Sequence, residues 1–90
     1  MLRFKIKEMM ARREFESGRR ITIIEVAEGA GIHRATLSKM INRRGFSTST
    51  GHIDGLCRYF DCRVEELVEY VPDELVHKVV STPRQEKQPN

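Results

Sequence analysis

Residues 23–42 read IIEVAEGAGIHRATLSKMIN, and this stretch contains the signals for two short helices joined by a tight turn. Thr22 stands just before this stretch, and Glu25 follows it by three residues, which makes a capping box. Ile21 and Val26 flank the cap as a hydrophobic staple, so we expect a helix to begin at residue 23. Gly31 favours the left-handed backbone that would end this helix near residue 30.

A second helix is expected from about Arg34 to Arg43, with Leu37, Met40 and Ile41 as its apolar stripe. At 100° per residue, the opposite face carries Ala35, Ser38, Lys39 and Asn42. Two short, tightly packed helices require a glycine turn, a small residue where they cross and apolar residues between them. The sequence meets these requirements, with Ala27 at the expected crossing. The stretch therefore predicts a helix-turn-helix, whose second helix enters the major groove of DNA.

The flanking sequence predicts three more helices. One runs from Lys5 to about Ser17 and ends at Gly18; before it, Leu2 and Phe4 alternate with charged residues, as in a short strand. After a polar loop at 46–51, Ser49 is the expected cap of a fourth helix, with Ile53, Leu56, Cys57 and Phe60 facing inward. A fifth helix is expected to open at Arg63–Val64, to bury Leu67, Val68 and Val71, and to close at Pro72.

Beyond Pro72 the signals weaken. Residues 75–80 are compatible with a short strand, and residues 81–90 have the composition of a disordered tail. We expect one helix-turn-helix domain over residues 1–74, followed by a C-terminal extension over 75–90.

Composition limits the possible functions of the 90 residues. The net charge of +3 is unevenly distributed, because residues 1–47 carry +6 and residues 48–74 carry −5. A basic half favours a polyanionic partner. Without a membrane-spanning run or a signal peptide, we expect a cytoplasmic protein. Cys57 and Cys62 are interpreted as buried free thiols, because their C-x4-C spacing is unusual for zinc.

The segment Gly31-Ile32-x-Arg34-x-Thr36-Leu37-Ser38 resembles the recognition-helix opening of the XRE family, the Cro and phage-repressor class of helix-turn-helix. The resemblance continues through Ser49, Leu56-Cys57 and Cys62-x-Val64-x-x-Leu67-Val68-Glu69-Tyr70. It implies an all-α, compact five-helix domain, often dimeric, that binds operator DNA and regulates transcription, for example as a repressor. Two positions depart from the family pattern: Ile23 replaces the glutamine that helps to hold a phosphate, and His33 replaces the usual serine or threonine cap.

The resemblance also implies roles for individual residues. Residues that read bases are expected at Arg34, Ala35, Ser38 and Lys39. Residues that contact the DNA backbone are expected at Thr22, His33, Arg43, Arg44, Thr48 and Thr50. Solvated arginines, and charges that favour a helix C-terminus, remain alternatives for the basic residues.

The apolar residues Leu67, Val68, Tyr70 and Val71 exceed the needs of one small core, so they are expected either in the core or in a homodimer interface, aided by residues 75–80. The expected partners are double-stranded DNA and a second copy, with no membrane. No cofactor, metal or catalytic arrangement is predicted. The alternative function is a protein-interaction module, such as an antitoxin that binds its toxin through residues 75–90.

Overall fold

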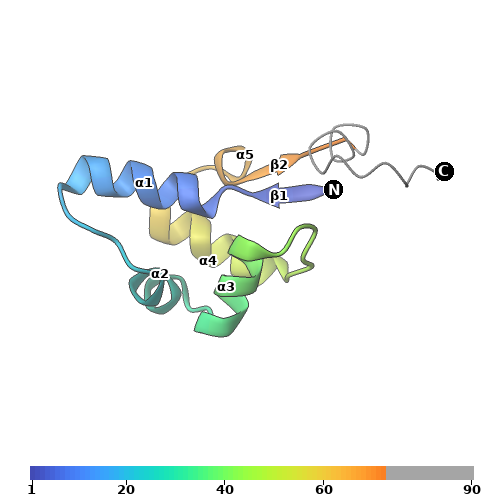
Figure 1. The fold of residues 1–90 in the computed structure, drawn as a ribbon, viewed down its shortest axis with the longest axis horizontal. Helices are drawn as coiled ribbons and strands as arrows, with labels where there is room; N and C mark the ends of the chain where they lie inside the picture. Colours follow the sequence, from blue (N-terminus) through green and yellow to red (C-terminus); the bar gives the residue numbers. More distant parts are fainter. Residues whose placement is uncertain (73–90) are drawn as a thin grey trace.

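The structure, a computed structural model, describes residues 1–72, which form five helices and a two-stranded sheet (Figure 1). This is the compact five-helix fold expected from the sequence, with short strands near its ends. In chain order the elements are β1 (Leu2–Phe4), α1 (Ile6–Ser17), α2 (Ile23–Ala30), α3 (Arg34–Asn42), α4 (Thr50–Phe60), α5 (Val64–Leu67) and β2 (Val68–Tyr70). The strand and tail predicted beyond residue 74 lie outside the described residues.

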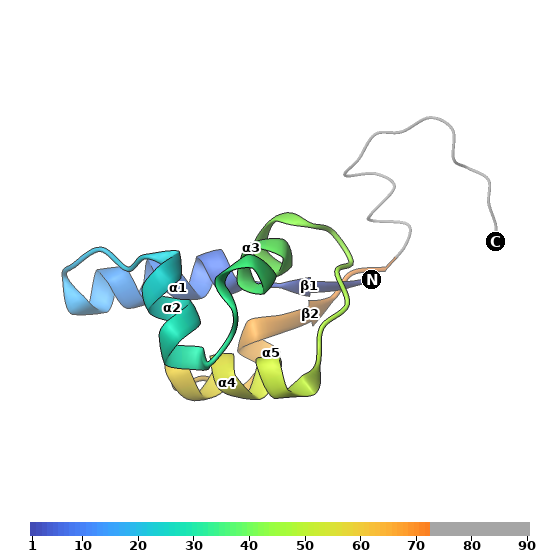
Figure 2. The same cartoon turned by 90° about the horizontal axis from the view of Figure 1, so that it is seen from below.

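The helix-turn-helix forms where the sequence predicts it. Thr22 caps α2, and the capping box with Glu25 is complete. Gly31 ends α2 with a φ of 72°, and the Ile32 amide donates to the Ala27 carbonyl at 2.9 Å. Two residues later the chain enters α3. Viewed from below, α2 lies in front of α1 (Figure 2).

Helix α2 also crosses α4 very closely, and this contact was not predicted. A Cβ atom on Gly55, in the middle of α4, would lie 2.2 Å from the Ala30 carbonyl oxygen at the end of α2. A Cβ on Gly29 would meet the Tyr59 ring at 2.3 Å. The two helices approach so closely because both crossing points lack a side chain.

The core lies between α1, the helix-turn-helix and α4. Its largest fully buried side chains are Ile6, Val26, Leu37, Leu56 and Leu67. Ala27 is also buried, as its predicted place at a helix crossing requires. No charged side chain among residues 1–72 is buried, so every ionic group of this part keeps access to water or to a partner at the surface.

The predicted extent of the fifth helix is wrong. Helix α5 has only four residues, and Val68 begins a strand instead of continuing the helix. Strand β2 pairs antiparallel with β1, with Phe4 opposite Val68 and Leu2 opposite Tyr70. β-branched and aromatic residues favour this extended pairing, and an Arg3–Glu69 ion pair at 2.7 Å joins the strands across the ladder.

Candidate nucleic-acid interface

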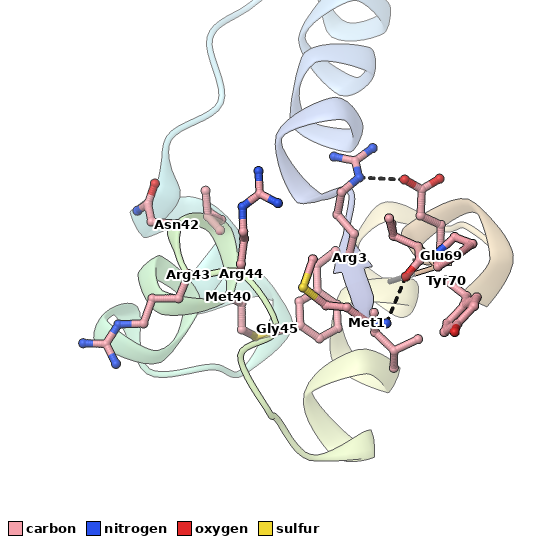
Figure 3. A pocket seen from close by; sticks show the side chains of 14 residues that line it. Met1, Arg3, Met40, Asn42, Arg43, Arg44, Gly45, Glu69 and Tyr70 are labelled. Carbon is pink, nitrogen blue, oxygen red and sulfur yellow. Dashed lines mark hydrogen bonds and ion pairs between the residues drawn. The ribbon is translucent and has the colours of Figure 1, made fainter. Parts of the chain in front are cut away.

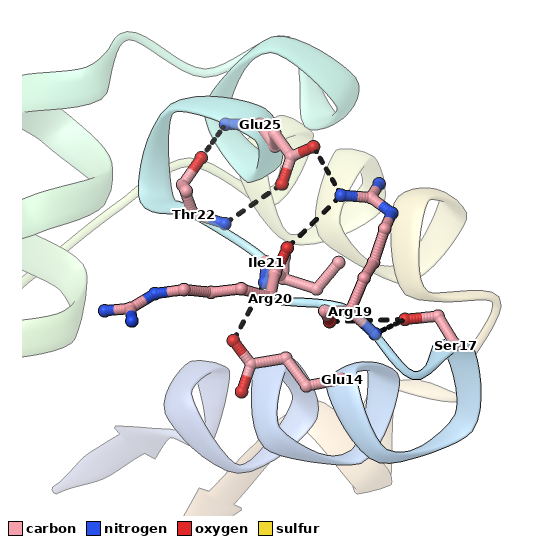
Figure 4. Close-up of polar contacts among 7 residues, drawn as sticks. All are labelled: Glu14, Ser17, Arg19, Arg20, Ile21, Thr22 and Glu25. Atoms are coloured by element: carbon pink, nitrogen blue, oxygen red, sulfur yellow. Dashed lines mark hydrogen bonds and ion pairs between the residues drawn. The ribbon is translucent and has the colours of Figure 1, made fainter.

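The linker into α2 is held by side-chain hydrogen bonds (Figure 4). A Glu14 carboxylate oxygen accepts from the Ile21 amide at 2.8 Å, and Glu25 accepts from the Thr22 amide at 3.0 Å. Arg19 lies 3.0 Å from the other oxygen of Glu25. The Thr22 backbone hydrogen bond and then Arg19 lower the pKa of Glu25, so this carboxylate is charged at neutral pH. The N-terminus of α2 is therefore fixed in place.

The N-terminus of α3 is capped by a histidine. Nδ1 of His33 accepts a hydrogen bond from the Ala35 amide at 3.2 Å. Because Nδ1 accepts, the ring proton of the neutral imidazole is on Nε2, which remains able to donate. The departure from the family at this position therefore still provides a cap.

The exposed face of α3 carries the predicted base-reading residues. Arg34, Ala35 and Lys39 are exposed, whereas Ser38 is half-buried. The Asn42 amide donates to the Ser38 carbonyl at 3.0 Å and contacts its hydroxyl at 3.3 Å. The polar groups of Ser38 are thus partly used in hydrogen bonds within the helix, while the side chains of Arg34, Ala35 and Lys39 are accessible to a ligand.

One groove brings half of the predicted contact residues together. It has a volume of about 740 Å³ and lies between the N-terminal ends of α2 and α3. Its lining includes two of the predicted backbone contacts and three of the predicted base readers, which are Thr22, His33, Arg34, Ala35 and Ser38. Lys39 lies outside the lining, on the exposed side of α3.

The remaining predicted backbone contacts lie outside the lining of this groove. Arg43 and Arg44 are exposed just after α3, where Arg43 is the C-terminal cap residue. Thr50 is the exposed first residue of α4. Thr48 is half-buried, and its hydroxyl lies 2.7 Å from Nδ1 of His52, so it is already engaged within the protein.

Sequence reasoning missed Arg20. Its backbone belongs to the fixed linker, and its side chain extends from that linker (Figure 4) and lines the groove beside Thr22 and Arg34. A basic residue two positions before a helix cap was the available signal, because anions bind at helix N-termini.

The basic residues of residues 1–72 differ in their ionic partners. Arg3, Arg12, Arg19, Arg58 and Arg63 each form an ion pair with a carboxylate. Those of the candidate interface have no carboxylate partner within residues 1–72; they are Arg20, Arg34, Lys39, Arg43 and Arg44. Lys5, Lys7 and Arg13, at or in α1, also have no carboxylate partner within residues 1–72, so the unneutralised positive charge lies around α3 and on α1.

The residues proposed for a dimer interface are in different environments. Leu67 is fully buried, so of the two expected environments it takes the core. Val68 and Val71 are half-buried. Tyr70, by contrast, is 67% exposed.

Two free thiols lie near the end of α4. Cys57 and Cys62 are half-buried rather than fully buried as expected. Burial, and then the neighbouring Cys57 thiol, raise the pKa of Cys62 to about 11. No group of three or more potential metal ligands occurs in the described part of the chain.

A Thr-capped helix, a glycine turn and a second helix with an exposed basic face define a helix-turn-helix DNA-binding protein. The comparison with protein families agrees: residues 5–73 match the Cro/C1-type HTH DNA-binding domain, and the chain belongs to that family. Searches of curated proteins and of solved structures give no significant match. Over residues 1–72, no helix is both long and apolar enough to cross a membrane.

Proposed function

We propose that the protein is a sequence-specific regulator of transcription that binds double-stranded DNA as a homodimer and has no catalytic activity. The main support is the distribution of charge: all five basic residues around α3 lack carboxylate partners in residues 1–72, whereas five of the eight basic residues elsewhere in this part are paired. When unpaired Lys and Arg side chains neutralise DNA phosphates, the counterions condensed on the DNA are released. This release is a large part of the affinity of such proteins for DNA.

In this proposal α3 lies in the major groove. Arg34 makes a bidentate contact with a guanine, and Ala35 contacts a thymine methyl group. Lys39 and the unengaged side of Ser38 reach neighbouring bases or phosphates. The helix is short enough that one copy reads only a few base pairs, so two copies are needed for a specific site.

The phosphate contacts are proposed on both sides of that helix. One strand of the DNA backbone is contacted by Arg20, Thr22 and His33. Beyond the other end of α3, the DNA backbone is contacted by Arg43 and Thr50. Ile23 packs partly against the core and has no polar group, so it cannot make the glutamine contact of the family. Arg20 lines the same groove as Ile23 and is the residue proposed to replace that contact.

Selection of bound sequences from random duplex DNA tests the proposal. A two-fold symmetric site is expected, with half-sites about 34–36 Å apart. Affinity should fall steeply with salt, by a logarithmic slope of roughly 0.9 for each phosphate neutralised. Failure to enrich any sequence, with affinity insensitive to salt, would refute DNA binding and leave the antitoxin-like alternative.

Substitutions separate reading from positioning. Arg34→Ala should relax preference at particular base pairs, with a loss of about 1–3 kcal/mol. Arg43→Ala should weaken all sequences alike and lower the salt slope by about one. Arg58→Ala is the matched control, because Arg58 is exposed on α4 and already paired with Asp54. An Arg34→Ala variant that loses affinity equally for specific and random DNA would show that Arg34 contacts only phosphate.

A further inference from the structure

A second groove, separate from the one between α2 and α3, lies between the sheet and the C-terminal end of α3 (Figure 3). It has a volume of about 560 Å³. Its lining includes Leu2 and Tyr70, which face each other across the β1–β2 ladder. Leu2 is 51% exposed and Tyr70 is 67% exposed, so two large apolar side chains lie side by side in solvent. Adjacent exposed apolar side chains of this kind mark an interaction surface.

The polar rim of this groove is positively charged. Arg3 is neutralised by Glu8 at 2.9 Å and Glu69 at 2.7 Å. Arg44 has no carboxylate partner within residues 1–72, and Figure 3 shows its side chain extending beside the groove, whereas Arg43 points away from it. An occupant should therefore combine apolar side chains with a carboxylate near Arg44.

The chain itself carries such a segment directly after the described residues. Residues 73–80 read DELVHKVV, with two carboxylates followed by four aliphatic side chains. Val71 and Pro72 form part of the groove wall, so this segment starts at the rim. Strand β2 ends at Tyr70, only three residues before this segment begins. To cover Tyr70 of its own chain, the segment would therefore have to turn back along β2, whereas a segment from a second copy needs no such turn.

We propose that residues 73–80 of each copy bind in this groove of the other copy and so form the homodimer. Leu75 and Val76 of one copy cover Leu2 and Tyr70 of the other, and Glu74 pairs with Arg44. Each copy has one groove and one segment, so a two-fold axis satisfies both and the assembly closes at two copies. The groove adjoins the end of α3, so this contact also sets the spacing between the two recognition helices.

This inference rests on the homodimer of the proposed function, and sedimentation equilibrium of the full chain and its variants tests it. Leu2→Glu and Leu75→Glu should each raise the dimer dissociation constant at least tenfold. Val64→Glu is the matched control, because Val64 is 56% exposed on α5 and does not line the groove; it should dimerise like the parent. Leu75 lies outside the described fold, so its variant keeps the test valid if Leu2→Glu disturbs β1.

A charge exchange tests the polar contact. Arg44→Glu and Glu74→Arg should each weaken the dimer, and the double variant should recover most of the affinity. Dimerisation that is unchanged in Leu2→Glu and Leu75→Glu would overturn this interface while leaving the homodimer intact. A chain that stays monomeric at all concentrations and on its selected DNA would overturn both.

Binding to a duplex with a single half-site distinguishes the two proposals. Leu2→Glu and Leu75→Glu should keep the parent's affinity for this duplex and lose affinity only for the two-fold site. If the parent dimerises through the groove but binds no DNA, the interface stands and the proposed function fails. If Leu75→Glu changes protease sensitivity but not molecular mass, the segment binds its own chain, and the exchanged dimer is wrong.

Discussion

The close crossing of α2 and α4 makes the two glycines of α4 respond oppositely to alanine. In Gly55→Ala, the new Cβ would lie 2.2 Å from the Ala30 carbonyl oxygen, which is a backbone atom and cannot rotate away. The helices must separate, and overpacking of this kind costs about 1–3 kcal/mol or more. Alanine regains up to about 1 kcal/mol of helix propensity. Gly55→Ala should therefore lower the free energy of unfolding by about 1–2 kcal/mol.

Gly51 provides the control in the same helix. A Cβ there meets only the Ser49 hydroxyl, at 3.6 Å, and the backbone is not left-handed. Gly51→Ala should therefore keep the propensity gain, about 0.5–1 kcal/mol, reduced by its place in the first turn. In a domain of this size, about 1 kcal/mol shifts the melting temperature by about 4–8 °C.

Thermal and urea unfolding of the parent and both variants checks the argument. The Tm of Gly55→Ala should fall, and that of Gly51→Ala should stay equal or rise. The affinity of Gly55→Ala for DNA should also fall, because α4 fixes the end of α2 and α2 fixes α3. A Gly55→Ala protein with the stability of Gly51→Ala would refute the close approach of the two helices.

Four further outcomes are expected. Ala27→Leu should destabilise the protein by about 1–3 kcal/mol, measured by urea unfolding, because Ala27 is buried at the helix crossing. Arg20→Ala should weaken binding to all DNA sequences alike and lower the salt slope, measured by fluorescence anisotropy from about 50 to about 200 mM salt. Iodoacetamide should label Cys62 at pH 8 roughly a hundredfold more slowly than a thiol of pKa 9.0, since its pKa of about 11 leaves less thiolate; peptide mass spectrometry would measure this. Arg3 lowers the pKa of Glu69, so the charged carboxylate stabilises the fold above its unfolded pKa of about 4.5. This stabilisation is lost as the pH falls through the lower pKa of the folded state, and Glu69→Gln should therefore flatten the decline of Tm below about pH 4.5.

Local signals were sufficient to predict the helix starts. The capping box of Thr22 with Glu25 and the Ser49 cap involve residues three apart, and both form as expected. Gly31 likewise ends α2 in the left-handed conformation. These features depend on hydrogen bonds within one turn, which a sequence pattern specifies directly.

Features that depend on distant partners could not be predicted in this way. Val68 and Val71 suit the apolar face of a helix, yet β2 forms because β1, at the opposite end of the described chain, provides a partner strand. The approach of Ala30 to Gly55 also joins two segments that are far apart in the sequence. The end of α4 shows a third limit: Asp61, not a glycine, takes the left-handed conformation with φ of 52°.

The interface was only partly predictable for the same reason. Helical spacing predicted that Ala35 and Lys39 share the exposed face of α3, and both are exposed. Arg34 was assigned to the expected interface by the family resemblance. Arg20 belongs to a linker, and its place in the groove depends on how Glu14 and Glu25 hold that linker. A periodic pattern contains no information about such tertiary contacts.

The two departures from the family are connected through this groove. A serine or threonine cap at position 33 would use its oxygen to accept from the helix and its hydroxyl proton to donate. The His33 ring does the same with two atoms, since Nδ1 accepts from Ala35 and Nε2 carries the proton. With Ile23 unable to donate, we propose that Arg20 and His33 together provide donors for a DNA phosphate beside the N-termini of α2 and α3, in place of the family's residues.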